Sequence, residues 1–259
     1  MNLPEVTIEQ LLNAGIHFGH NTRRWNPKME QYIFGTRNKI HIIDLRITLV
    51  LINNALAKLY EVISKSGKIL IVGTKKQASP IVENLAIETE QCFVNKRWLG
   101  GTLTNWKTIS ISIKKLEELE ILISDKNSNL NLSKKELLNI SREKDKLNLN
   151  LGGIKNLGGI PDIVLVFDAL KDKLAILEAK KLNIPVIGIL DTNADPDLVE
   201  FPIPGNDDAL RSINLYADLF KSTIIEAKKT ISIPKEEKSQ SKEEKNNESS
   251  VISTNKNKK

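Results

Sequence analysis

Cysteine and histidine are scarce in this chain of 259 residues, which contains one cysteine, Cys92, and three histidines. A single cysteine cannot form an intrachain disulfide or a cysteine-based zinc cage, so a reducing compartment is the natural interpretation. No apolar run approaches the roughly 20 residues that cross a bilayer, and the N-terminus lacks the charged-then-apolar pattern of a signal peptide. We therefore expect a soluble cytosolic protein with no membrane partner, or one used inside an organelle.

The chain also lacks the motifs of common nucleotide-dependent and hydrolytic enzymes. Gly73 follows an apolar run, but the G-x-G-x-x-G and G-K-[ST] fingerprints are absent. No nucleophile elbow with a Ser-His-Asp order is present. His17 and His20 are spaced H-x-x-H, yet no third metal ligand is obvious. These absences disfavour an enzyme, and we predict no cofactor, no small-molecule substrate and no metal site, for which His17 and His20 would be the candidate ligands.

The basic residues are distributed unevenly along the chain. The formal net charge is +6, and residues 65–110 hold seven Lys or Arg against three Asp or Glu. Residues 151–230 hold nine against twelve, so the second half is slightly acidic. Such an asymmetry predicts that one side of the protein faces nucleic acid.

Hydrophobic patterning alternates between strands and amphipathic helices. Apolar runs predict strands at 40–43, 68–73, 92–94, 163–167 and 185–190, with a proline-bounded edge strand at 201–204. Apolar residues at steps of three and four predict helices at 7–15, between Asp44 and Gly67, and at 77–88, 171–181 and 207–229. Residues 17–39 look irregular and basic. The alternating order predicts an α/β fold, a parallel sheet with helices on both faces.

Two helices without an intervening strand interrupt this alternation. The pattern predicts helices at 104–124 and 133–150 around a polar turn, each with a narrow apolar stripe, which is typical of an antiparallel coiled-coil hairpin. Gly100-Gly101 and Gly152-Gly153 at the two roots favour tight turns. The predicted organisation is an α/β domain made of 1–103 and 152–232, an inserted hairpin at 104–151, and a disordered polar tail at 233–259.

The segment from Asn95 to Trp106 concentrates aromatic and basic residues. It holds two of the three tryptophans of the chain, Trp98 and Trp106, next to Lys96 and Arg97. This composition suits a surface that stacks on and neutralises a polyanion. Trp106 lies on the apolar stripe of the hairpin, so we expect it to pack there. For Trp98, packing and RNA stacking both stay open.

Ordered blocks of residues resemble a known family. They are Gly15–His20, Arg24–Met29, Ile33–Gly35 with Arg37-Asn38, Asn95 with Arg97–Gly101, Leu103–Asn105, Gly158-Gly159 with Pro161-Asp162, Asp191–Asn193 with Asp195-Pro196, and Ile203–Ala209. In order and content they are similar to the bacterial form of the universal small ribosomal subunit protein two family. The resemblance runs from about Ile8 to Glu226.

The resemblance implies a Rossmann-like or flavodoxin-like domain with a protruding coiled-coil hairpin, and no catalysis. It implies a structural role in translation, with small-subunit ribosomal RNA bound at the head–body junction. It further implies contacts with neighbouring small-subunit proteins, including the messenger-binding ribosomal protein one in bacteria. Lys96 stands where many bacterial members carry His, and the tail is not a family feature. The implied location is the ribosome of a bacterial cytosol or an organelle.

The candidate RNA-binding side chains are mostly basic or aromatic. They are Arg23, Arg24, Trp25, Lys28, Arg37, Lys39, Lys75, Lys76, Lys96, Arg97, Trp98, Asn105, Lys107, Lys114 and Lys115. Two other functions stay as alternatives: a nucleotide-dependent α/β enzyme, and a free regulatory RNA-binding protein.

Overall fold

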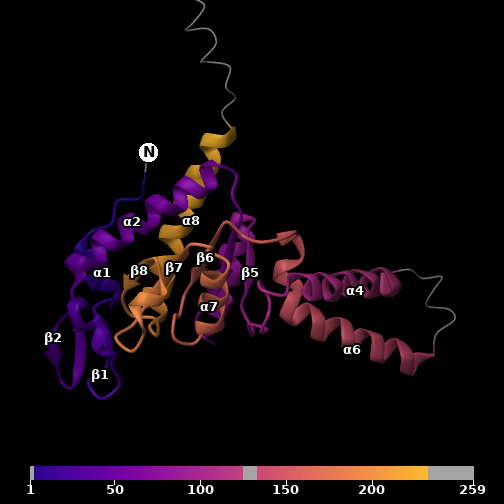
Figure 1. Cartoon of the computed structure of the whole chain (residues 1–259), viewed down its shortest axis with the longest axis horizontal. Coiled ribbons are helices and arrows are strands. Elements are labelled where there is room, and N and C mark those ends of the chain that lie inside the picture. The colour runs from indigo at the N-terminus through magenta and orange to yellow at the C-terminus, as the bar shows by residue number, and fades with distance from the viewer. Residues whose placement is uncertain (1–2, 125–132, 233–259) are drawn as a thin grey trace, which may run out of the picture.

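The computed structural model describes residues 3–124 and 133–232 (Figure 1). The predicted polar turn at 125–132 and the predicted disordered tail at 233–259 lie outside the described residues.

A parallel sheet of five strands forms the centre of the domain. The strands are β4 (Ile69–Val72), β5 (Cys92–Val94), β6 (Ile163–Val166), β7 (Val186–Leu190) and β8 (Phe201–Pro204). Their spatial order is β5-β4-β6-β7-β8, which is 2-1-3-4-5 in order of appearance. This is the flavodoxin-like order rather than that of the Rossmann fold. The predicted α/β fold and the edge position of the proline-bounded strand are confirmed.

Helices cover both faces of this sheet, as predicted. They are α1 (Ile8–Ala14), α2 (Leu45–Ser64), α3 (Ser79–Thr89), α7 (Lys173–Lys181) and α8 (Leu210–Ser232). Ile69 and Ile71 belong to a core shared with α1, α2, α3 and α8, whereas Leu70 and Val72 belong to a second core shared with α7. Because side chains alternate along a strand, a continuous apolar run supplies both cores.

Helix α2 is apolar enough to require comment, because by length and composition it could cross a membrane. This contradicts the expectation that no apolar run reaches that length. Asp44 caps the helix by accepting a hydrogen bond from the Arg46 N–H at 2.9 Å. Ile52, Leu56 and Leu59 are buried in the first core, against α8 and the sheet. Its composition is that of a core helix.

The prediction that residues 17–39 are irregular is wrong. β1 (Phe18–Asn21), β2 (Ile33–Arg37) and β3 (Ile40–Ile43) form an antiparallel sheet in the order β1-β3-β2, with the 3-10 helix η1 (Pro27–Tyr32) between the first two. We call this the small sheet. Asn38 and Lys39 both have positive φ, 52° and 63°, so they form a two-residue hairpin turn. The sequence hid this turn because Lys replaces the usual glycine.

The predicted helical hairpin is present. α4 (Trp106–Ser124) pairs with α6 (Lys134–Leu151), and Ser133 begins α6 with a capping box that involves Glu136. Ile109 and Ile113 of α4 are buried in the second core together with Leu151. The base of the hairpin therefore belongs to the α/β core. The 3-10 helix η2 (Gly152–Leu157) follows, and a short one, η3 (Pro196–Leu198), lies between β7 and β8.

The two hairpin roots require glycine for different physical reasons. Gly101 has φ +88°, a left-handed conformation that favours glycine, so a tight turn is present at the first root. Gly153 has no such φ, but a Cβ there would lie 2.3 Å from the carbonyl oxygen of Phe93. The second root thus needs glycine for close approach to β5, not for a turn. By contrast, a Cβ atom added at Gly100 would have no other atom within 4 Å.

One carboxylate fastens the first hairpin root to the domain. Glu178 of α7 accepts hydrogen bonds from Trp98 Nε1 at 3.0 Å and from the N–H groups of Gly101, Leu103 and Thr104 at 2.8, 3.0 and 3.1 Å. The Thr104 hydroxyl donates to the same carboxylate at 3.1 Å. Burial would raise the pKa of Glu178, but these donors outweigh it and hold the pKa below its ordinary value.

Gly153→Ala should lower the free energy of unfolding by about 1–3 kcal/mol, because its methyl group cannot fit beside a backbone oxygen. Urea denaturation measures this loss. Gly100→Ala is the matched control, with open space at Cβ and an expected change near zero. Equal unfolding free energies for the two variants would contradict this account of the second root.

Glu178→Gln should cost about 2 kcal/mol of unfolding free energy, since a charged acceptor of several hydrogen bonds becomes a neutral amide. Hydrogen exchange should quicken at Gly101, Leu103 and Thr104. The control is Glu117→Gln, an exposed carboxylate on α4. Unchanged exchange at the root would show that Glu178 does not fasten it.

Candidate nucleic-acid interface

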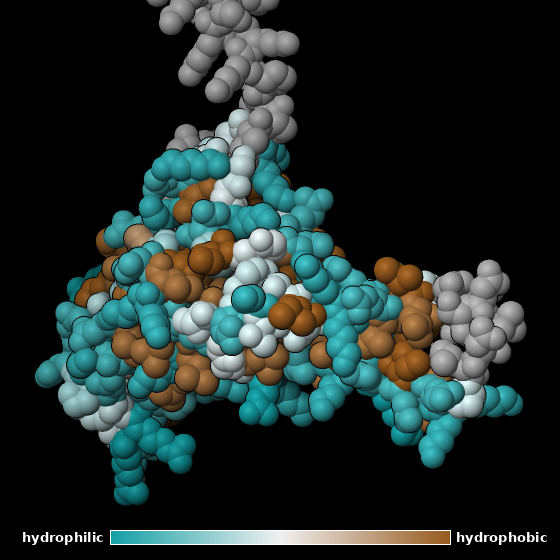
Figure 2. Space-filling view, turned by 45° about the vertical axis from the view of Figure 1, so that its right-hand side comes forward, coloured by the Kyte–Doolittle hydropathy of each residue, from teal (hydrophilic) through white to brown (hydrophobic). Residues whose placement is uncertain are grey.

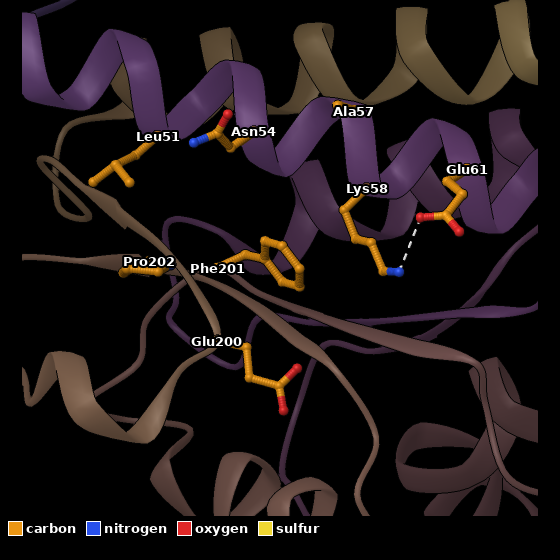
Figure 3. A pocket seen from close by; sticks show the side chains of 8 residues that line it. All are labelled: Leu51, Asn54, Ala57, Lys58, Glu61, Glu200, Phe201 and Pro202. Carbon is orange, nitrogen blue, oxygen red and sulfur yellow. Dashed lines mark hydrogen bonds and ion pairs between the residues drawn. The ribbon is translucent and has the colours of Figure 1, made fainter.

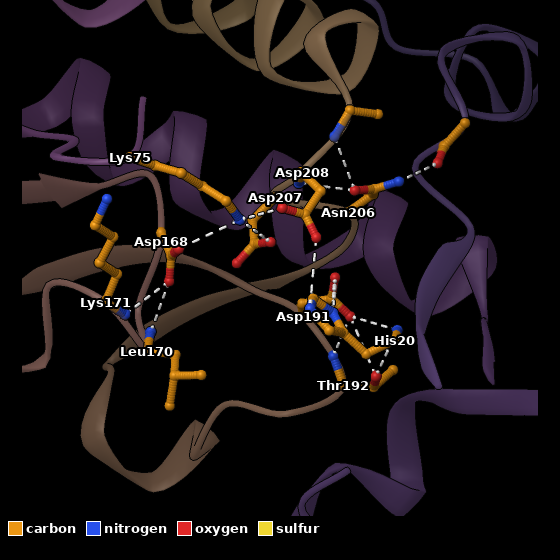
Figure 4. A network of polar contacts seen from close by, with 12 residues as sticks. His20, Lys75, Asp168, Leu170, Lys171, Asp191, Thr192, Asn206, Asp207 and Asp208 are labelled. Atoms are coloured by element: carbon orange, nitrogen blue, oxygen red, sulfur yellow. Dashed lines mark hydrogen bonds and ion pairs between the residues drawn. The ribbon is translucent and has the colours of Figure 1, made fainter. Parts of the chain in front are cut away.

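The crevice at the carboxyl ends of the parallel strands is where proteins of this fold bind ligands. Here a polar network fills it (Figure 4). Lys75, which follows β4, lies 2.7 Å from a carboxylate oxygen of both Asp207 and Asp208 and 3.3 Å from Asp168. Lys75 was predicted to contact RNA phosphate, but its side chain is only 15% exposed and already has carboxylate partners.

The small sheet closes the crevice from the side. His20 of β1 places Nδ1 2.7 Å from Asp191 and Nε2 3.4 Å from Asp208. Its backbone N–H donates to Asp191 Oδ1 at 3.1 Å and to the Thr192 hydroxyl at 3.0 Å. The hydrogen bond to Asp191 is the main cause that raises the pKa of His20. The histidine therefore serves as a tie between the two sheets.

The network is too acidic to attract a nucleotide phosphate. Burial lowers the pKa of Lys75, but its bonds to Asp207 and Asp208 leave that pKa above its ordinary value. Burial, together with Asp168 and Asp191, raises the pKa of Asp207 to about 7. Several carboxylates share one ammonium group, so the crevice repels anions.

The same cluster bears on the candidate metal ligands. The nearest ligand atoms of His20, Asp191, Asp207 and Asp208 lie within 4.8 Å of one another, a donor set that could hold a divalent cation. His17 does not belong to this set. Its ring packs at a tilt against that of Phe18, with centroids 3.9 Å apart, so the two histidines of the H-x-x-H spacing do not belong to one ligand set.

A second hollow, of about 480 Å³, lies between α2 and the edge strand β8 (Figure 3). Its polar lining includes Lys58, which pairs with Glu61 at 3.0 Å. The lining has no histidine or cysteine, and Glu61 is shared with a second lysine, Lys65. The other carboxylate of the lining, Glu200, has no partner among the described residues that would orient it as an acid or base.

Most of the predicted cations are exposed, and the described part of the chain gives them no carboxylate partner. They are Arg23, Arg24, Arg37, Lys39, Lys76, Lys96, Arg97, Lys107 and Lys114. Two others are tied to the protein. Lys28 lies 3.0 Å from Asp195 and 2.7 Å from Asp197, and Lys115 pairs with Glu143 across the hairpin.

The remaining candidates have different environments. Trp98 is 6% exposed and belongs to the second core, so its ring packs inside the protein. Trp106 packs on the same core, as expected. Asn105 is exposed and accepts a hydrogen bond from the Thr108 hydroxyl at 3.0 Å. Trp25 is 37% exposed.

The fold brings the free cations together in two places. The Thr22 N–H donates to the Lys39 carbonyl at 3.0 Å, so the turn with Arg23 and Arg24 lies beside the β2–β3 turn. Lys76 and Lys96 line one hollow of about 260 Å³ at the start of α3. Lys96 also lines a neighbouring hollow formed with residues 148–150 of α6, next to the hairpin root.

Comparison with known proteins identifies the family. A family model described as ribosomal protein S2 matches residues 11–227. The small ribosomal subunit protein uS2 of Caulobacter vibrioides is 56% identical over 226 residues, which cover 87% of this chain and 84% of that protein. The uS2 proteins of Mesorhizobium japonicum and Maricaulis maris are each 54% identical over 87% of this chain, covering 86% and 78% of their own lengths.

The fold, the crevice filled by its own side chains and the matching relatives all indicate the same family. The chain belongs to the ribosomal protein S2 family of structural, non-enzymatic proteins of the small ribosomal subunit.

Proposed function

We propose that this protein binds small-subunit ribosomal RNA through its exposed, unpaired cations. The observation that carries the proposal is the contrast between the two kinds of surface. The crevice that would bind a small ligand is closed by Lys75 and its carboxylates, while nine predicted cations face solvent without partners among the described residues. Exposed Lys and Arg side chains without a carboxylate partner can neutralise RNA phosphates, and such contacts do not depend on the base sequence.

Two basic groups carry this contact. The first is formed by the turns of the small sheet, with Arg23, Arg24, Arg37 and Lys39. The second runs from the start of α3 to the hairpin root and includes Lys76, Lys96 and Arg97, with Lys107 and Lys114 further along α4. Lys28, Lys75, Lys115 and Trp98 leave the list because their side chains are paired or buried.

The hairpin has the surface of a protein contact. Ile111 and Ile121 of α4 are 61% and 67% exposed, and Leu138 and Leu149 of α6 are 50% and 57% exposed. Figure 2 shows apolar side chains along this arm, at the right of the view. We infer that residues 104–151 form an inserted arm for neighbouring proteins, between the two parts of the α/β domain, 1–103 and 152–232. The family resemblance favours ribosomal protein one as a neighbour. The relatives are bacterial, so the setting is the ribosome of the bacterial cytoplasm.

Arg97→Ala should lower the salt slope of ribosomal RNA binding by about one unit, because one phosphate contact and its counterion release are lost. The measurement is the RNA affinity of the free protein over a series of salt concentrations. Lys65→Ala is the control, since Lys65 already pairs with Glu61 at 2.6 Å and lies outside both groups. An unchanged slope for Arg97→Ala would remove this residue from the contact.

Leu138→Asn should reduce the amount of ribosomal protein one retained on reconstituted small subunits, because it removes exposed apolar area from the arm. Sedimentation of the subunits followed by quantification of both proteins measures the effect. Leu174→Asn on α7, 58% exposed, is the control. Full retention with both variants would place the contact elsewhere.

A further inference from the structure

The small sheet gathers the exposed aromatic side chains of the molecule. Phe18, Trp25 and Phe34 are 48%, 37% and 70% exposed. Every other aromatic side chain in residues 3–124 and 133–232 whose exposure is known is buried or half-buried. A surface that leaves several aromatic rings in water marks a place where another molecule binds.

The charge of the same region favours a polyanion. Residues 15–43 contain five Lys or Arg and one acidic residue, Glu30. Arg23 and Arg24 follow β1 directly, and neither has a carboxylate partner in the part of the chain that the structure describes. A protein surface rich in aromatic rings and free guanidinium groups complements RNA bases and phosphates together.

A buried histidine beside Trp25 lacks hydrogen-bond partners. His41 of β3 is 7% exposed, and both ring nitrogens are buried without a partner. The rings of Trp25 and His41 pack with centroids 5.2 Å apart at 37°. Because an external ligand cannot reach these buried nitrogens, His41 acts as a support for the Trp25 ring, whose exposed part stays available for stacking.

We propose that Trp25, supported by the ring of His41, holds one unpaired nucleotide of the small-subunit ribosomal RNA. The base stacks on the exposed part of the Trp25 ring. Arg23 and Arg24 neutralise the adjoining phosphates. The nucleotide is unpaired because bases inside an A-form helix present no free face for stacking. This inference rests on the proposed RNA-binding function and names the type of RNA that the small sheet takes.

The test compares a short single-stranded oligoribonucleotide with a duplex of the same strand. Trp25→Ala should weaken binding of the single strand by roughly tenfold, the loss of one stacked base, and leave duplex binding unchanged. Trp25→Phe should fall in between, because it keeps an aromatic face beside His41. Leu174→Ala, an exposed apolar side chain on α7, is the matched control.

A second measurement compares the quenching of tryptophan fluorescence in the unaltered protein and in Trp25→Phe. Trp98 is buried, but Trp106 is half-buried beside the second basic group, so the part of the quenching that Trp25→Phe lacks is the part that reports on Trp25. Quenching by the single strand and not by the duplex is expected. It remains informative even if Trp25→Ala fails to fold.

The outcomes separate this inference from the function on which it rests. Equal binding of the single strand by Trp25→Ala and wild type, or no quenching of Trp25, overturns the stacking site while RNA binding stands. Normal RNA binding by Trp25→Ala with poor entry into small subunits would make the surface a protein contact, which also overturns it. Failure of the wild-type protein to bind either RNA would instead overturn the proposed function.

Discussion

The rest of the molecule depends on the cluster of carboxylates around Lys75. This ammonium group joins the segments that follow β4, β6 and β8, through Asp168, Asp207 and Asp208. His20 extends the cluster to the small sheet through Asp191. Loss of one partner of a buried ion pair typically costs about 3–5 kcal/mol, because the remaining charge is left uncompensated. In an enzyme of this fold these polar groups would face a ligand, whereas here they bind one another.

Because its own side chains fill the crevice, the groups that can bind other molecules lie on the outer surface of the protein. With the crevice closed, the exposed features are the basic turns of the small sheet, the hollow lined by Lys76 and Lys96, and the hairpin. Two of these features, the small sheet and the hairpin, are held in place by hydrogen bonds to the domain. His20 holds the small sheet, and Glu178 holds the hairpin root through several donors. Groups that are already held in place lose less conformational freedom when they bind, which favours binding.

Local patterning predicted the strands and helices of the parallel sheet well, because buried strands and amphipathic helices have strong periodic signals. It failed for β1 and β2, which are short strands that depend on the Asn38-Lys39 turn and on the close approach of Gly19 to Thr192. Among the candidate contacts, exposure could be guessed for cations in turns such as Arg23. It could not be guessed for Lys75 or Trp98, because their partners Asp207 and Glu178 lie 132 and 80 residues further along the chain.

The sequence by itself determined the fold class, the inserted hairpin and the family, because these follow from periodicity and from ordered motifs along the chain. Only the tertiary structure decided which basic and aromatic side chains are free. Residues of the same type differ in exposure because their neighbours in space come from distant parts of the chain. Lys76 faces solvent, whereas the ammonium group of Lys75 binds Asp207. Likewise Trp25 stays exposed over His41, while Trp98 donates to Glu178 inside the second core.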